Sequence, residues 1–256
     1  MKRLVLLLAC AAACKSGPEA TPTAQTDRKD GYKAVVDAPD RSEADRKLDP
    51  GRHPAEMLEF LDVKPGMKVL DVGAGPGYTT ELIARAVAPG GAVYMQNDPR
   101  WMPFLKDAVA ERFTHPAMQG TVRAEVPFDE PVPTQAKDLD LVVINVIYHD
   151  VVNMPVDRAR MNKLIFDALR PGGTYVVIDS SAKDGTGVSE TNTLHRIDEA
   201  VVRDEVQKAG FRLDRQSSFL RNPGDARDWN ASPGAAAKAG KRGTSDRFAL
   251  KFVKPG

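Results

Sequence analysis

Three glycines at alternate positions follow a short apolar run in the first third of the chain. Residues 69–80 read VLDVGAGPGYTT, with Asp71 followed by Gly73, Gly75 and Gly77. Glycine has no Cβ, so a loop rich in glycine lets the backbone approach a ligand closely. The residues before the loop predict a buried strand, and those after it predict a helix. Turns of this kind bind several nucleotide-containing ligands, so the glycines alone do not identify the ligand.

Two common nucleotide-binding motifs do not fit this loop. A phosphate-binding P-loop has Lys and then Ser or Thr directly after its last glycine, whereas Tyr78 and Thr79 follow Gly77 here. A dinucleotide-binding loop has the pattern G-x-G-x-x-G, and the sixth position counted from Gly73 is Tyr78. Asp71 would also repel a pyrophosphate. A tight turn without a ligand is the simpler alternative.

Asp71 is suited to a positively charged ligand. S-adenosylmethionine carries an ammonium and a sulfonium group. One close ion pair, at about 4 Å and an effective dielectric constant of about 20, has a Coulomb energy of roughly 4 kcal/mol before desolvation. We therefore expect the loop to bind S-adenosylmethionine, with Asp71, Gly73, Gly75 and Gly77 as cofactor-binding residues.

Strand-like and helix-like segments alternate around this loop. The alternation predicts an α/β fold in which helices cover both faces of a mostly parallel sheet. The last two strands, 211–220 and 247–253, have no helix between them, so we expect them to pair antiparallel. The other expected strands lie at 67–72, 92–97, 121–126, 139–148 and 174–180, and the expected helices at 54–61, 79–88, 101–113, 158–169 and 196–210.

The N-terminal residues predict export. Residues 1–14, MKRLVLLLACAAAC, join a positive start to an apolar run about half as long as the roughly 20 residues of a membrane-spanning helix. They therefore indicate a signal peptide. They resemble a bacterial lipoprotein signal, in which a lipidated Cys becomes the new N-terminus. Cys10 and Cys14 are both candidates, and Cys14 leaves the more usual apolar length. A cytosolic protein with an apolar N-terminus is the alternative.

Two further segments lack the pattern of a core. Residues 15–50 are polar and charged and rich in Pro, Ala and Thr, which predicts a tether before a single domain at 51–256. Residues 222–246 form a loop too long for a hairpin turn and too rich in Gly, Pro and Ala for a helix of its own. Such loops are lids or binding loops, or else disordered; Trp229 favours a contact role.

The motif D-V-G-A-G-P-G after a strand resembles the first motif of the class I S-adenosylmethionine-dependent methyltransferases. The similarity covers about residues 50–256: LRPGGTYVVID at 169–179 resembles the start of their fifth strand, and LDLVVINVIYHD at 139–150 their fourth strand and the active-site loop after it. Other segments resemble an uncharacterised branch of predicted bacterial methyltransferases. The resemblance implies a three-layer Rossmann-like sheet, mostly parallel, with one antiparallel strand near the C-terminus. The segments shared with that branch are RHPAEMLEFL, YHD, TLHRIDEAVV, AGFRL, FLRNP and SDRFALKF.

The resemblance also assigns further cofactor residues. In the family, the second strand usually ends in an acidic residue that binds both ribose hydroxyls; here Asn97 holds that position and Asp98 follows. A charged hydrogen bond contributes about 1.5–3 kcal/mol and a neutral one about 0.5–1.5 kcal/mol, so we expect about tenfold weaker binding unless Asp98 substitutes. Glu125 is a candidate for the adenine amino group, and Asn145 lies at the end of the fourth strand.

Three residues after the fourth strand are candidates for catalysis: Tyr148, His149 and Asp150. Methyl transfer from a sulfonium is an in-line displacement, so the protein must place the acceptor atom opposite the sulfur. It must also remove a proton from an O–H or N–H acceptor. His149 is the most suitable base, because the ordinary pKa of histidine is near 6.5. The alternative is that His149 only orders the loop.

A metal site is a further possibility at the same rim. Asp179 closes the fifth strand, and His195 and Glu199 share one face of a predicted helix, with Asp198 next to Glu199. These side chains could form an oxygen-rich site like those of metal-dependent O-methyltransferases. Pairing among surface side chains is the commoner explanation, so no metal site is assigned.

Together these patterns predict an exported, lipid-anchored methyltransferase with a small-molecule acceptor. The chain has 36 Lys and Arg against 35 Asp and Glu, and no basic patch interleaved with aromatic residues, so no nucleic-acid partner is expected. No oligomeric state is inferred. One alternative is an exported binding module that keeps the fold without catalysis, because S-adenosylmethionine is made in the cytoplasm. Another is inefficient export with an active cytoplasmic pool.

Overall fold

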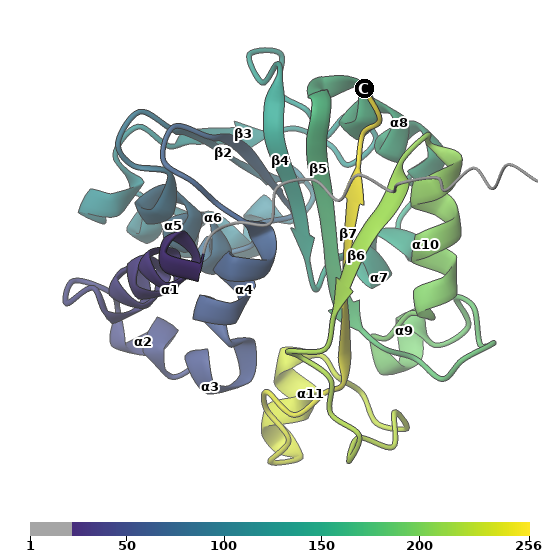
Figure 1. Ribbon diagram of the computed structural model, residues 1–256. Coiled ribbons are helices and arrows are strands. Elements are labelled where there is room, and N and C mark those ends of the chain that lie inside the picture. Colours follow the sequence, from purple (N-terminus) through teal and green to yellow (C-terminus); the bar gives the residue numbers. More distant parts are fainter. Residues whose placement is uncertain (1–21) are drawn as a thin grey trace, which may run out of the picture.

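A seven-stranded sheet forms the centre of the computed structural model, which describes residues 22–256 (Figure 1). The strand order is β3-β2-β1-β4-β5-β7-β6. β7 pairs antiparallel with β5 and β6, and the other neighbouring strands pair parallel. The predicted fold class is therefore confirmed. The strands are β1 (Lys68–Val72), β2 (Ala92–Asn97), β3 (Val122–Glu125), β4 (Leu139–Asn145), β5 (Leu169–Ser180), β6 (Arg212–Ser217) and β7 (Arg247–Val253).

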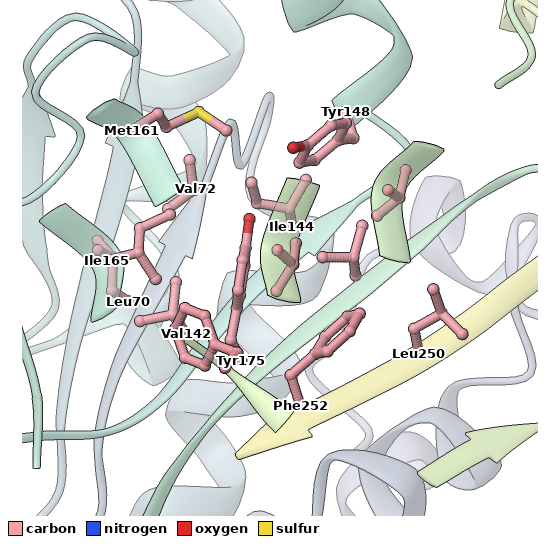
Figure 2. Close-up of a cluster of buried hydrophobic side chains, with 14 of the residues drawn as sticks. Leu70, Val72, Val142, Ile144, Tyr148, Met161, Ile165, Tyr175, Leu250 and Phe252 are labelled. Atoms are coloured by element: carbon pink, nitrogen blue, oxygen red, sulfur yellow. The ribbon is translucent and has the colours of Figure 1, made fainter. Parts of the chain in front are cut away.

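Alternating side chains along the strands build one core on each face of the sheet. In β1, Val69 joins the core under α1 (Pro22–Asp37), α4 (Pro54–Leu61) and α5 (Tyr78–Val87). Leu70 and Val72 join the core under α7 (Tyr148–Val152), α8 (Arg158–Ala168) and α10 (Glu199–Lys208). Figure 2 shows the second core, in which Tyr175 lies among the apolar side chains of the neighbouring strands. Full burial of one large apolar side chain contributes about 1.5–3 kcal/mol. The helices not described below are α4 (Pro54–Leu61), α5 (Tyr78–Val87), α6 (Met102–Arg112), η1 (Pro116–Met118), α8 (Arg158–Ala168) and α10 (Glu199–Lys208).

Residues 22–52 form three helices, where the sequence predicts a polar tether up to residue 50. Tyr32 is 7% exposed, and its hydroxyl donates a hydrogen bond of 2.8 Å to the carbonyl oxygen of Val63. The carboxylate of Asp45 lies 2.5 Å from the guanidinium of Arg112 in α6. Buried groups of this segment such as Tyr32 and Asp45 therefore bond to the domain instead of to water, which composition does not reveal. The three helices are α1 (Pro22–Asp37), α2 (Glu43–Arg46) and α3 (Asp49–Arg52).

The predicted fourth strand, 139–148, ends early. β4 stops at Asn145, and the next residue, Val146, has φ +61°. This conformation is strained for a β-branched residue, and it turns the chain sharply into α7 (Tyr148–Val152). Strained backbone is often found at functional sites. The turn puts His149 on a helix at the carboxyl edge of the sheet.

The loop at 222–246 contains a short helix that the sequence argued against, α11 (Pro233–Lys238). Ser232 caps it by accepting a hydrogen bond from the backbone N–H of Ala235. Pro at the first helical position and alanines after it suit a helix. Across residues 22–256, no helix combines the length and the apolar character that a bilayer crossing requires. The predicted signal peptide at 1–14 lies outside the described residues.

Candidate functional site

The glycine loop lies where the strand order reverses, because β1 is flanked by β2 on one side and β4 on the other. In open α/β sheets, ligands bind at this switch point, beyond the carboxyl ends of the strands. The end of β2 holds the loop in shape. The side-chain oxygen of Gln96 accepts a hydrogen bond of 2.8 Å from the N–H of Gly73. The backbone oxygen of Gln96 accepts one of 2.9 Å from Ala74.

Asn97, in the position of the family's ribose-binding acid, pairs with the loop itself. Its Oδ1 accepts a hydrogen bond of 2.8 Å from the N–H of Gly75, and its Nδ2 donates one of 2.9 Å to the oxygen of Gly75. A carboxylate could not make the second bond, because it has no donor. An amide at position 97 is therefore explained by its two hydrogen bonds to the backbone of Gly75. The expected contact of Asn97 with ribose stays a prediction.

Asp98 is fully buried and already bound within its own turn. Its carboxylate accepts hydrogen bonds from Arg100 Nε at 2.8 Å and from the N–H of Phe128 at 2.9 Å. Burial acts to raise the pKa of Asp98, but the bonds from Arg100 outweigh it and hold the pKa below its usual value. Substitution of Asp98 for the ribose-binding acid would require this network to open.

Asp71 is buried beneath the glycine loop with only one of its two oxygens paired. Oδ2 accepts a hydrogen bond of 2.6 Å from the hydroxyl of Thr80, and Oδ1 has no partner among the described residues. Burial raises the pKa of Asp71 to about 7, against smaller opposing effects of Thr80 and the nearby Arg52. A buried carboxylate oxygen without a partner is costly unless a ligand completes it.

Two arginines without carboxylate partners lie close by. Arg52, Asn145 and Arg247 line an enclosed cavity of about 30 Å³. Arg52 stacks on the ring of Tyr78, with 4.3 Å between the guanidinium carbon and the ring centroid. The described residues offer neither arginine an ion pair, although the buried Arg112, for example, pairs with Asp45. Burial lowers the pKa of Arg52, and it lowers that of Arg247 to about 10 with help from the charge of Arg52.

The charges of these groups match those of the amino-acid end of S-adenosylmethionine, although the cavity beside Arg52 is not lined by Asp71 and has room for about one water molecule. Asp71 offers an unpaired carboxylate oxygen to an ammonium, and Arg52 offers a guanidinium to a carboxylate. Gly75, at φ +58°, faces open space: a Cβ built there would have no atom within 4 Å. Gly73 is tight instead, because a Cβ would lie 2.7 Å from Ile147. The residues present therefore fit the predicted cofactor.

His149 lies on the other side of the switch point, held by Asp179. The side chain of His149 is 5% exposed. Its Nδ1 donates a hydrogen bond of 2.7 Å to Asp179, and its backbone N–H donates a second of 2.9 Å. Burial acts to lower the pKa of His149, but the charges of Asp179 and Asp150 outweigh it and raise the pKa. This leaves Nε2 to face Asp150, at 3.4 Å.

Two predicted site residues lie apart from this arrangement. Tyr148 is fully buried in the core shown in Figure 2. Its hydroxyl donates a 2.7 Å hydrogen bond to Glu205 and accepts one of 2.8 Å from Asn162. The side chain therefore belongs to the packing between α7, α8 and α10. Glu125 is exposed and pairs with Arg123 at 2.5 Å, so its contact with adenine stays a prediction.

The side chains considered as metal ligands from the sequence, Asp179, His195, Asp198 and Glu199, do not come together as one set. His195 ends α9 (Thr191–Leu194) in the left-handed conformation, φ +49°, so it shares no helix face with Glu199. Asp198 caps α10 by accepting a hydrogen bond from Ala200, and Glu199 pairs with Arg203. His195 faces Asp150 instead, with 3.3 Å between Nδ1 and Oδ1.

The loop at 222–246 packs beside His195. Asn230 donates a hydrogen bond of 2.8 Å to the carbonyl oxygen of Thr193, and the N–H of Ala231 donates one of 2.8 Å to that of Leu194. Trp229 is tied down within the loop through a 2.7 Å bond to Asp225. The loop therefore forms one wall beside the histidines, and its action as a lid stays a prediction.

Arg52 and Arg247 were not expected from the sequence. Each lies in a segment that resembles the bacterial branch, Arg52 in RHPAEMLEFL and Arg247 in SDRFALKF. At both positions, the sequence pattern is a charged residue next to an apolar segment. It could not identify a pair, because the two arginines come from opposite ends of the domain.

Residues 27–100 match the family model described as "Protein-L-isoaspartate(D-aspartate) O-methyltransferase (PCMT)". A protein-L-isoaspartate O-methyltransferase from Aeropyrum pernix is 33% identical over 122 residues, which are 47% of this chain and 42% of that protein. One from Triticum aestivum is 27% identical over 182 residues, 66% of this chain and 70% of that protein. The chain thus spans less than half of the Aeropyrum protein.

A crystal structure of a SAM-dependent methyltransferase from Aquifex aeolicus has the same fold. The TM-score is 0.55 at 16% identity, with 92% of this chain and 99% of that chain covered. The class I methyltransferase fold is confirmed, and the matches support a methyltransferase with S-adenosylmethionine as cofactor. The family match holds β1, the glycine loop and β2, whereas His149, Asp179 and His195 lie beyond its end.

Proposed function

We propose that this chain transfers the methyl group of S-adenosylmethionine to an oxygen of a small-molecule acceptor bound beyond β4 and β5. The observation that carries the proposal is the half-paired Asp71 beside the unpaired Arg52, under a loop whose Gly75 faces open space. Bound there, the cofactor supplies an electrophilic methyl group on a sulfonium. The rest of the work belongs to the chain's own side chains.

The residues on the cofactor side bind and orient S-adenosylmethionine. Asp71 holds the ammonium, and Arg52, with Arg247 behind it, holds the carboxylate. In the free protein Asp71 has a raised pKa because it is buried. An ammonium placed against it favours the ionised form, so binding expels a proton when the pH is near or below 7. The hydrogen bonds of Gln96 and Asn97 keep the loop open for the sugar.

The acceptor side moves a proton. Asp179 fixes the ring of His149 with Nδ1 as donor, so Nε2 is the nitrogen left to face an acceptor. Asp150 stands next to it and stabilises the charged ring. The side chain of Asp150 is 32% exposed and that of His195 is 31% exposed, with the loop at 222–246 beside them. This half-enclosed setting favours a small acceptor.

A peptide carboxylate is the second candidate acceptor. The family match at residues 27–100 favours it, since the matched relatives are protein-L-isoaspartate O-methyltransferases. The family model ends at residue 100, whereas the match to the Triticum aestivum protein covers 66% of this chain. The half-enclosed setting of Asp150 and His195 is why the small molecule is the first candidate.

Two measurements test the proposal. Calorimetric titration with S-adenosylmethionine should show micromolar binding, and titration with NAD should show none. Transfer from methyl-tritiated S-adenosylmethionine is then measured to a panel of small carboxylic and hydroxy acids and, separately, to an isoaspartyl peptide and its aspartyl counterpart. Label on a small acid supports the first candidate, and label on the isoaspartyl peptide alone replaces it. Binding without transfer to any acceptor supports a binding module.

Export and lipid anchoring are part of the same proposal and rest on residues 1–14 alone. Cells that express the chain are labelled with a palmitate analogue, alongside Cys10→Ser and Cys14→Ser variants. Loss of label in the Cys14→Ser variant supports Cys14 as the anchor. Absence of label from the parent chain would remove the anchor.

A further inference from the structure

His149, Asp150 and His195 bring three metal-ligand atoms together at the carboxyl edge of the sheet. Each residue offers one ligand atom, and these atoms all lie within 4.8 Å of one another. Asp150 approaches His149 through Nε2 and His195 through Nδ1. Two of the residues lie in α7 and the third follows α9. The tertiary fold therefore creates the cluster, which is not the set that sequence spacing suggested.

The two separations that involve Asp150 suit ligands of one metal ion better than hydrogen bonds. Asp150 Oδ1 lies 3.4 Å from His149 Nε2 and 3.3 Å from His195 Nδ1. A charged N–H···O bond is about 2.7–2.9 Å long, as the 2.7 Å contact between His149 and Asp179 is. Ligands bound tetrahedrally at about 2.0–2.1 Å are themselves roughly 3.3 Å apart.

Asp179 supplies an outer partner of the kind that metal-bound histidines have. A ligating histidine almost always donates its other ring N–H to a carboxylate or a carbonyl, which fixes the ring and the tautomer. Asp179 is fully buried and receives the Nδ1 proton of His149, so Nε2 is presented as the free ligand. This pairing is independent of the positions of Asp150 and His195.

The cluster also has unneutralised charge and an open side. Within the described chain, the charged partners at ion-pair distance from Asp150 are the two histidines. Asp150 and His195 are each about one-third exposed, so an ion can enter from solvent. Three protein ligands with one open position form the usual arrangement of a catalytic zinc site.

We propose that His149, Asp150 and His195 bind one divalent first-row transition-metal ion, of the zinc type, with an oxygen ligand in the open position. Two imidazoles and one carboxylate suit zinc, iron, cobalt or nickel better than magnesium, which prefers oxygen ligands. The oxygen ligand is water or an oxygen of the acceptor. Metal binding does not depend on the proposed methyl transfer and is measured without cofactor. With the ion bound, His149 Nε2 is a ligand, and an acceptor oxygen bound to the ion loses its proton to water instead of to His149.

Equilibrium dialysis of the full chain against Zn²⁺ or Co²⁺ tests the site. The protein carries no histidine tag, and Cys10→Ser and Cys14→Ser remove the thiols that would also bind these ions. We expect about one ion per chain and, with Co²⁺, the visible absorption of a four-coordinate ion. His195→Ala and Asp150→Asn should each weaken binding at least 100-fold, and Asp179→Asn should weaken it about 10- to 100-fold through the position of His149.

His53→Ala is the matched control, because His53 also faces a carboxylate, that of Glu56 at 3.7 Å, and is 45% exposed. It should bind metal like the parent. Thermal unfolding in EDTA checks that each variant is folded. His195 and Asp150 are partly exposed, so their variants should keep the fold. Absence of stoichiometric binding by the parent, or equal binding by His195→Ala and the parent, would overturn the metal site.

Discussion

Two buried aspartates lie at the carboxyl edge of the sheet, and their carboxylates differ in the number of hydrogen bonds that they accept. Asp71, at the end of β1, has one hydrogen bond and one unpartnered oxygen, and burial raises its pKa to about 7. Asp179, at the end of β5, accepts two hydrogen bonds from His149 and one from the N–H of Ser180. Both carboxylates are almost inaccessible to solvent.

The difference separates a binding group from a positioning group. A buried carboxylate that is fully paired stabilises the folded chain and fixes its neighbours. One that is left half-paired destabilises the free protein and gains most from a ligand of opposite charge. We therefore assign Asp71 to the cofactor and Asp179 to the orientation of His149.

Asp71→Asn should produce the largest effect. Loss of the charge facing the ammonium should weaken binding of S-adenosylmethionine about 100-fold. The same change should raise the melting temperature of the free protein at pH 8, because it removes a buried, half-paired charge. Calorimetry and thermal unfolding measure the two effects. Unchanged affinity together with a lower melting temperature would make Asp71 a structural residue like Asp179.

Asp179→Asn should show the opposite pattern. It removes the charge that pairs with His149 and should lower the free energy of unfolding by about 2 kcal/mol. The affinity for S-adenosylmethionine should stay within a few-fold of the parent value. Denaturant unfolding and calorimetry measure these two quantities. A loss of cofactor affinity as large as that of Asp71→Asn would end the division into two roles.

The pH dependence of binding should sharpen the comparison. In the proposed binding mode the cofactor needs the ionised form of Asp71, whose pKa is about 7 in the free protein, so affinity should fall about tenfold between pH 6 and pH 5. Since this pKa lies above the ordinary value of 3.8, the contribution of Asp71 to stability falls as the pH rises from about 4 to 7. In the Asp71→Asn variant, calorimetry at each pH should give a nearly constant affinity. If the affinity of this variant still fell between pH 6 and pH 5, another group would be responsible for the pH dependence.

Tyr148→Phe should have the smallest effect. The hydroxyl of Tyr148 bonds to Glu205 and Asn162 inside the core, so its loss should lower the free energy of unfolding by about 1 kcal/mol. Turnover and cofactor affinity should not change. A clear fall in turnover, with stability preserved, would return Tyr148 to the catalytic set.

The sheet and the cofactor loop could be predicted because their determinants are local. Runs such as LDLVVIN give strands, and Asp71 and the glycines lie within a few residues of one another. The exact end of β4 could not be predicted, since Val146 adopts its strained φ only because the surrounding fold holds it there.

The acceptor side and the helices at 22–50 depend on distant partners. Asp45 meets Arg112 across 67 positions, and His149 meets Asp179 across 30. A polar composition therefore concealed α1 to α3, and helical spacing grouped His195 with Glu199 when its neighbour is Asp150. The sequence predicted histidines and carboxylates near the carboxyl edge of the sheet, but it could not predict which of them contact one another.

The packing of α1 against the domain has a consequence for distance from a membrane. A free tether of about 36 residues would let the enzyme range some 120 Å from its anchor. Because Arg28 of α1 pairs with Asp62 of the domain, a lipid on Cys14 would leave at most about 13 residues as spacer, which reach at most roughly 45 Å. The enzyme would then work within a thin layer next to the bilayer, and its acceptors would be molecules that enter that layer.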